Sequence, residues 1–181
     1  LIKDYKKMIT MDLKDVDNIV LVIGKTEGHL DHSLFARNIL DEKNGPPPEI
    51  NLFNEKNNGE TLLKLIDLGL IKSAHDVSLG GIITSISKMC VKGNKGISLN
   101  KPKNLISKIG YFFGEDQGRY LVEVTNKDYK KVADILNKNA VHFDELGVIN
   151  EDQLFINDKT KVSIDELRTS NTTWLTNYMS K

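Results

Sequence analysis

Uninterrupted apolar positions mark the centre of the expected sheet. The run Ile-Val-Leu-Val-Ile at residues 19–23 has no polar interruption, and such a β-branched run predicts a strand buried on both faces. Tyr120, Val122 and Val124 alternate with their neighbours and so share one face of a second strand at residues 120–124. Shorter runs predict further strands at residues 97–99, 111–113, 143–149 and 153–156.

Apolar residues at helical spacing predict the helices. Ser33 is placed to cap a short helix that runs through Leu40. Longer helices are expected at residues 52–68, 82–91 and 127–137, and Gly69 is placed to end the first of these. The apolar positions expected to face the core are Leu34, Phe35, Ile39, Leu62, Leu63, Leu65, Ile66, Ile82, Ile83, Ile86, Met89, Cys90, Tyr129, Val132, Ala133 and Leu136.

The last helix is predicted by its start. The sequence Ser-Ile-Asp-Glu at residues 163–166 has the capping-box pattern. Trp174, Tyr178 and Met179 follow on this helix and are expected to pin it to the body of the domain. Two stretches are expected outside helices and strands: a stiff Gly-Pro-Pro-Pro loop at residues 45–48 and a turn at residues 157–159.

Strands and helices interleave along the chain, which predicts an α+β fold with a mixed β-sheet covered by helices. A length of 181 residues suits one domain with a short extension. We expect residues 1–14 to be a linker or remnant of an upstream domain and residues 15–181 to form the domain. The chain begins at Leu1 and is therefore expected to be a piece of a longer protein.

Composition and charge exclude several classes of protein. Hydrophobic residues make up 39% of the chain and charged residues 28%, which is typical of a packed domain. The 25 basic and 25 acidic residues cancel, so the charge balance indicates neither a nucleic-acid nor a membrane partner. No apolar run approaches the about 20 residues of a membrane span. The single cysteine, Cys90, cannot form an internal disulfide, and a cytoplasmic location is expected.

The first candidate site is the loop Ser-Ala-His-Asp-Val-Ser-Leu-Gly-Gly at residues 73–81. Asp76 and Ser78 are of the type that caps a helix start, and Gly80 and Gly81 permit a close backbone approach. A tight turn before a helix exposes amide N–H groups that can hold an anion; the same loop could equally hold nothing. His75 and Asp76 are neighbours on an extended segment and are expected to point apart.

The second candidate site is the turn at residues 114–118. Glu115, Gln117 and Arg119 offer carboxylate, amide and guanidinium groups that can bind a ribose hydroxyl or a phosphate, unless they form only a polar hairpin tip. Both candidate segments join a strand to a glycine-bearing turn, so we expect them to line one concave surface at the same end of the sheet.

Other chemistry is not indicated. His29 and His32 have the spacing of a metal-ligand pair, but no further ligands follow at a suitable distance, so no metal site is expected. The chain has no nucleophile elbow, no Walker loop and no dinucleotide-binding fingerprint.

Four stretches together resemble the C-terminal domain of the AIR synthase superfamily of purine-biosynthetic enzymes. They are residues 28–35, 45–48, 75–81 and 113–120. Their order and spacing are similar to those of the phosphoribosylformylglycinamidine synthase branch, and the resemblance covers nearly the whole chain. The chain departs from the family at Leu79, where an acidic residue is common, and at Asp31 and His32, where small residues are common.

The resemblance implies a part of an ATP-dependent carbon–nitrogen ligase. The intact enzyme would convert formylglycinamide ribonucleotide, glutamine-derived ammonia and ATP into the amidine, ADP and phosphate, with Mg²⁺ neutralising the phosphates. The family's catalytic residues lie in upstream domains, so no catalytic residue is assigned here, and the isolated chain is expected to be inactive and to hold no tightly bound cofactor. The implied partners are the upstream domains, a glutaminase and a small accessory subunit.

The family's internal duplication implies that the two candidate segments face an auxiliary phosphate or nucleotide site. Its candidate ligand-binding residues are Asp76, Ser78, Gly80, Gly81, Glu115, Gln117 and Arg119. Two alternatives remain: a non-catalytic scaffold or interaction module, and the C-terminal domain of another member of the superfamily. The proline run and the Glu-Asp-Gln-Gly-Arg turn favour the ligase over that other member.

Overall fold

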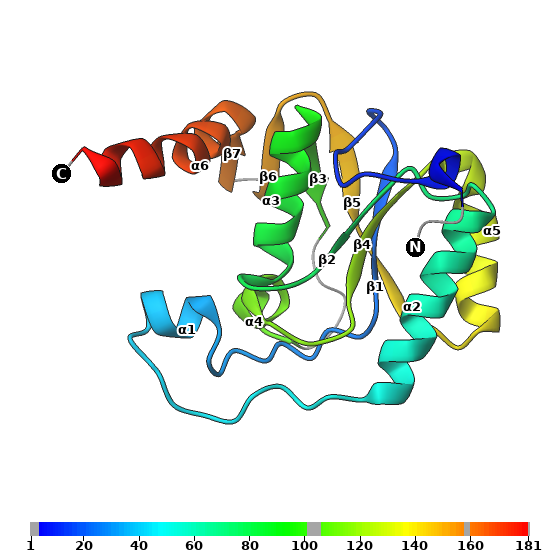
Figure 1. Cartoon of the computed structure of the whole chain (residues 1–181), viewed down its shortest axis with the longest axis horizontal. Coiled ribbons are helices and arrows are strands. Elements are labelled where there is room, and N and C mark those ends of the chain that lie inside the picture. The colour runs from blue at the N-terminus through cyan, green and yellow to red at the C-terminus, as the bar shows by residue number, and fades with distance from the viewer. Residues whose placement is uncertain (1–3, 101–105, 158–159, 181) are drawn as a thin grey trace.

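A seven-stranded sheet forms the centre of the fold in the computed structural model, which describes residues 4–100, 106–157 and 160–180 (Figure 1). The strand order is β2-β4-β1-β5-β3-β6-β7. The strands are β1 (Ile19–Ile23), β2 (Ser73–Asp76), β3 (Gly96–Leu99), β4 (Tyr120–Val124), β5 (Phe143–Asn150), β6 (Gln153–Asn157) and β7 (Thr160–Ser163). The helices are α1 (Leu34–Ile39), α2 (Leu52–Asp67), α3 (Gly81–Gly93), α4 (Lys108–Phe113), α5 (Asn126–Lys138) and α6 (Ile164–Met179), with a 3-10 turn at Tyr5–Lys7.

The sheet is mixed, as predicted. The strands β3 and β6 run parallel, and the other pairs of neighbouring strands run antiparallel. Helices cover both faces: α3 and α4 pack on one face and α2 and α5 on the other (Figure 1). Within the described residues, none of the helices combines the length and the apolar character that a membrane span requires.

The strand β1 is buried on both faces, as its unbroken apolar run predicts. Val20 and Val22 belong to the hydrophobic cluster under α3, whereas Leu21 and Ile23 belong to the cluster under α2 and α5. The β1 residues divide between the two clusters because alternate side chains of a strand point to opposite faces. The two clusters together hold the sheet between its helical layers.

Two of the expected elements differ in the structure. Residues 111–113 form the end of helix α4 and not a strand. The Ser107 hydroxyl caps this helix by accepting from the Gly110 N–H at 3.0 Å, and the helix buries Tyr111 and Phe112 in the core. Aromatic residues favour strands only weakly, and here the cap and the packing decide the structure. The expected turn at residues 157–159 lies largely outside the described residues.

The second difference concerns the C-terminal helix. The capping box at Ser163 and Glu166 is present, as predicted. Trp174, Tyr178 and Met179 do not pin α6 to the body, because their side chains are 63%, 64% and 74% exposed. The C-terminal half of α6 extends away from the sheet (Figure 1).

Two residues expected to face the core are instead exposed. Leu63 is 63% exposed because its helix α2 turns Leu62 and Leu65 inward and leaves the intervening residues outside. Ile39, at the end of the short helix α1, is 69% exposed.

The buried carboxylate of Glu123 fastens the N-terminal segment to the sheet. It lies on β4 with no exposed surface and accepts from the Lys14 and Asp15 backbone amides, from Asn18 Nδ2 and from the Ser73 hydroxyl. Hydrogen bonds of this kind satisfy a carboxylate that has lost its water. The segment just before residue 15 is therefore packed against the domain.

Cys90 provides a test of the packing of α3. Its side chain is fully buried, and burial raises the pKa of its thiol to about 12. The thiol should therefore react with a thiol reagent only when α3 opens, and denaturant should speed the reaction at least about 100-fold. Fast labelling of the native chain, followed by mass spectrometry, would contradict this packing.

Candidate functional site

The two candidate segments lie side by side at one end of the sheet. The strands β2 and β4 are antiparallel neighbours, with Asp76 opposite Tyr120. This pairing places the loop after β2 beside the turn before β4, and the Val77 N–H donates to the Arg119 carbonyl at 2.9 Å. The expectation that both segments share one end of the sheet is confirmed.

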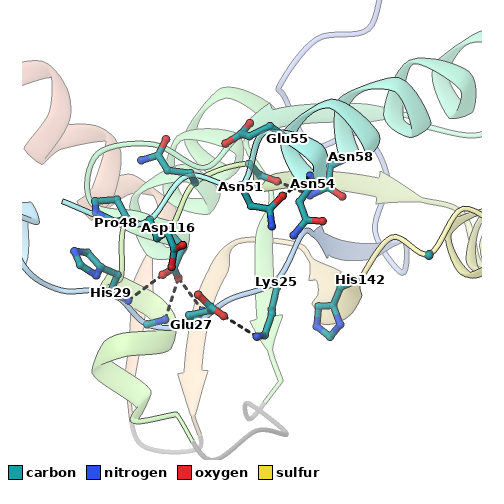
Figure 2. Close-up of a pocket in the computed structure, with 15 residues that line it drawn as sticks. Lys25, Glu27, His29, Pro48, Asn51, Asn54, Glu55, Asn58, Asp116 and His142 are labelled. Atoms are coloured by element: carbon teal, nitrogen blue, oxygen red, sulfur yellow. Dashed lines mark hydrogen bonds and ion pairs between the residues drawn. The ribbon is translucent and has the colours of Figure 1, made fainter. Parts of the chain in front are cut away.

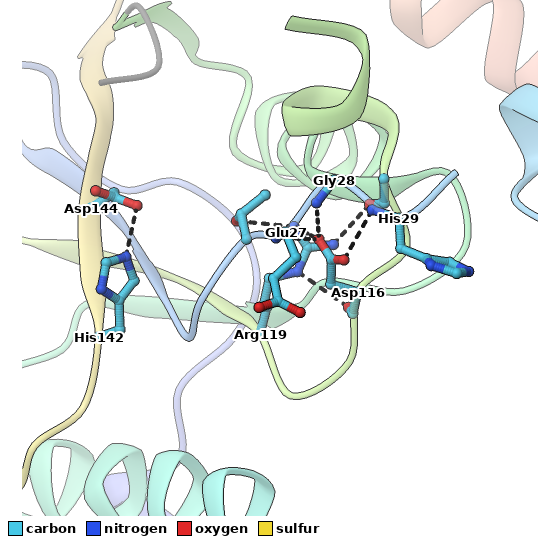
Figure 3. Close-up of polar contacts among 9 residues, drawn as sticks. Glu27, Gly28, His29, Asp116, Arg119, His142 and Asp144 are labelled. Atoms are coloured by element: carbon cyan, nitrogen blue, oxygen red, sulfur yellow. Dashed lines mark hydrogen bonds and ion pairs between the residues drawn. The ribbon is translucent and has the colours of Figure 1, made fainter. Parts of the chain in front are cut away.

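Asp116 organises this end of the sheet (Figure 3). Its carboxylate is largely buried and accepts from three consecutive backbone amides, those of Glu27, Gly28 and His29, each at 3.0 Å. These amides belong to the segment that follows β1, some ninety positions away along the chain. Several N–H donors compensate a buried carboxylate for the water that it has lost. The sequence motif contained Asp116, but it did not show which amides Asp116 would hold.

Arg119 stands behind Asp116 and does not face solvent. Its side chain has no exposed surface and lies 3.5 Å from the Asp116 carboxylate. Its guanidinium donates to the Asp116 and Gly114 carbonyls and to the Thr26 hydroxyl. Burial lowers the pKa of Arg119, and the charge of Asp116 opposes that shift. With these partners, the guanidinium holds the turn in place and has no surface to offer a ligand.

Glu115 accepts from one of the loop amides that the sequence suggested for a phosphate, the Gly80 N–H, and from one further backbone amide. Its Oε1 accepts from the Leu34 N–H at 2.7 Å and from the Gly80 N–H at 2.8 Å. The Glu115 N–H in turn donates to the His29 carbonyl at 2.8 Å. The free Gly80 amide expected from the sequence is therefore already occupied by a carboxylate of the same chain.

The expected caps of α3 are also different. The N-cap is Gly80, which has φ +85° and makes no side-chain capping bond. Ser78 contributes its carbonyl, which accepts from the Gly81 N–H at 3.0 Å. Asp76 instead contacts His75, with 3.1 Å between His75 Nδ1 and Asp76 Oδ1, so the expectation that these two residues point apart is wrong. Burial lowers the pKa of His75.

A cavity of about 280 Å³ opens between the two segments. Five of the seven candidate residues line it, whereas Gly80 and Gly81 are not among the lining residues. The lining residues are Glu55, Asp76, Val77, Ser78, Leu79, Glu115, Gln117, Gly118, Arg119 and Tyr120. This cavity brings the loop, the turn and the start of α2 together around one space.

A larger cavity of about 620 Å³ adjoins it and shares Glu55, Gln117 and Gly118 (Figure 2). Three carboxamides of α2 and its cap line this second cavity, together with Lys25, which pairs with Glu27 at 2.6 Å. The three are Asn51, Asn54 and Asn58. The sequence analysis did not predict that these asparagines line a cavity, although the closely spaced asparagines at residues 51–58 were a visible signal.

The described residues contain no group of three or more histidine, cysteine or acidic side chains arranged to hold a metal ion. The His29 ring instead contacts the Pro46 carbonyl, with 3.0 Å between Nε2 and the oxygen. His32 lies on the turn before α1.

Gly80 provides a test of the backbone at this site. A Cβ atom there would lie 2.2 Å from the Thr84 hydroxyl, at a φ of +85°. Gly80→Ala should therefore cost about 2–4 kcal/mol of unfolding free energy, from left-handed strain plus steric overlap. Gly69 has a similar φ of +68° but no atom within 4 Å, so Gly69→Ala should cost only about 1–2 kcal/mol. Equal losses in urea unfolding would contradict the tight contact at Gly80.

Comparisons with known proteins identify the family. The AIR synthase related protein, C-terminal domain, matches residues 15–159. The chain is 70% identical over 179 residues to the phosphoribosylformylglycinamidine synthase subunit PurL of Pelagibacter ubique, and 34% identical over 182 residues to that of Bartonella henselae. These matches cover 99% and 100% of the chain but 24% of each relative. The chain thus spans about a quarter of the length of these relatives.

Solved structures show the same fold. Thermotoga maritima PurL complexed with FGAR matches 90% of the chain and 30% of its own, with a TM-score of 0.77 at 19% identity. The same protein complexed with ATP matches 90% of the chain and 27% of its own, with a TM-score of 0.68 at 17% identity. The predicted likeness to AIR synthase C-terminal domains is confirmed. The chain belongs to the family of AIR synthase related proteins, C-terminal domain.

Proposed function

We propose that the chain serves as the C-terminal domain of a phosphoribosylformylglycinamidine synthase subunit. The observation that carries this proposal is the 70% identity to the P. ubique subunit, which extends over 179 residues. The match covers 99% of the chain and therefore includes the segments that line both cavities. The alternatives of a scaffold module or of another superfamily member are not favoured by this match.

The proposed reaction of the whole subunit joins ammonia to an activated amide. ATP phosphorylates the amide oxygen of formylglycinamide ribonucleotide, ammonia attacks the amide carbon, and phosphate leaves with that oxygen to give the amidine. Bound Mg²⁺ would supply charge neutralisation at the phosphates. No residue of this chain is assigned a catalytic role, so its contribution is to bind and position.

The binding contribution is assigned to the smaller cavity, as an auxiliary nucleotide site. Asp76, Ser78 and Gln117 line it with polar side chains, and Gly80 and Gly81 shape the loop behind them. Glu115 and Arg119 hold the wall through hydrogen bonds within the chain. In this proposal those two residues position the site.

The proposal also includes partners and a location. The chain would pack against upstream domains of the same polypeptide, with residues 1–14 as the connection. A solved structure of PurLQS from T. maritima has a PurL chain of the same fold within an assembly. We extend that arrangement to a glutaminase and a small accessory subunit, and place the biosynthetic enzyme in the cytoplasm.

A chimera tests this function directly. This chain would replace the matching 179 residues of the P. ubique subunit, and the chimera would be assayed for amidine formation with ammonia as nitrogen donor. We expect activity within about tenfold of the parent. A segment that is 70% identical should pack as the original segment does and so keep the reacting groups of the subunit in position. The isolated 181-residue chain, assayed alongside, should show neither ATP hydrolysis nor amidine formation.

Two outcomes would contradict the proposal. If the chimera is folded and assembled but inactive, the chain cannot replace the matching segment, and the sequence match does not carry the function. Turnover of formylglycinamide ribonucleotide by the isolated chain would show that catalytic residues lie within it. A subunit that lacks the segment altogether serves as the baseline for both.

A further inference from the structure

The carboxylate of Glu115 lies at the backbone amides where an external anion could otherwise bind. One of its oxygens accepts from two backbone amides that belong to separate segments, at 2.7 Å from Leu34 and 2.8 Å from Gly80. Gly80 is the N-cap of α3, a helix of 13 residues. Backbone amides at such a position favour a negative charge, and here the chain supplies that charge itself.

The groups that line the adjoining cavity do not favour a second anion. Glu55, Asp76 and Glu115 contribute three carboxylates. Among the described residues that line it, the one basic residue is Arg119, whose side chain is fully buried and donates to other parts of the chain. A phosphate placed there would meet these carboxylates and no exposed cation among the described lining residues, and like charges repel more strongly in a partly desolvated space.

The remaining polar groups of the cavity suit a ligand with hydroxyl groups. Ser78 and Tyr120 have hydroxyls, and Gln117 has an amide that both donates and accepts. The carboxylates beside them can accept from hydroxyl donors. The negative surroundings also show on Tyr120: burial raises its pKa, and the charges of Glu55 and Asp76 raise it further.

We infer that Glu115 is a built-in anion that excludes phosphate from this cavity, so that the cavity takes the uncharged, hydroxyl-bearing part of a ligand, such as a sugar. This inference rests on the proposed function in treating the cavity as a ligand site. It refines that function, because a nucleotide bound here would direct its sugar to the cavity and its phosphates elsewhere.

Anion rescue tests the role of Glu115. Thermal unfolding of the chain is followed in phosphate and in chloride at matched ionic strength. Glu115→Ala removes the acceptor of two amides and should lower Tm by about 5 °C in chloride. Phosphate should restore about half of that loss by filling the vacated position, and should leave the Tm of the unaltered chain unchanged.

Glu27→Ala is the matched control. It also removes one carboxylate, but that carboxylate is 63% exposed and pairs with Lys25. This variant should show no difference between phosphate and chloride. A specific phosphate effect on the unaltered chain, or no rescue of a folded Glu115→Ala variant, would overturn the inference.

Amide chemical shifts give a second readout that needs no variant. Ribose should shift the Ser78 and Gln117 amides, whereas inorganic phosphate should leave the Leu34 and Gly80 amides in place. Shifts of Leu34 and Gly80 with phosphate would overturn the inference while leaving the proposed ligase function intact. The absence of shifts with ribose would overturn the assigned ligand class. A failed chimera would instead count against the proposed function alone.

Discussion

The end of the sheet that carries the cavities depends on two adjacent carboxylates. Asp116 accepts from three amides of the segment after β1, and Glu115 accepts from the first amide of α1 and from the N-cap amide of α3. Charged hydrogen bonds of this kind are the stronger ones in proteins, and a buried carboxylate without them would be costly. A turn of a few residues therefore fixes three segments that are far apart in the sequence.

This constraint also determines the polarity of the site. Arg119 is used to hold Asp116 and the turn, so the described residues that line the smaller cavity offer it no exposed positive charge. Because Glu115 accepts from the Gly80 N–H, that amide is not available to an external anion. The same contacts that stabilise the loops thus underlie the proposed preference of the cavity for an uncharged part of a ligand.

The sequence predicted the layers of the fold better than it predicted the site. The unbroken run at residues 19–23 and the capping box at Ser163 are local signals, and both elements lie where they were expected. The aromatic run of α4 and the exposed Trp174 were mispredicted, because a short helix has little periodicity and apolar spacing does not show what a helix packs against. The role of Asp116 depends on amides about ninety positions away along the chain, and a local sequence pattern does not show which distant segments will be in contact.

Hydrogen exchange of individual amides tests the central role of the 114–118 turn most directly. In the native chain, the Gly28, His29, Leu34 and Gly80 amides should exchange slowly. Asp116→Asn should accelerate all four by at least about tenfold, because the loss of its carboxylate loosens the turn that also carries Glu115. Val22 in β1 should remain protected as the internal reference. Acceleration confined to Gly28 and His29, or fast exchange of all four amides in the unaltered chain, would contradict the account.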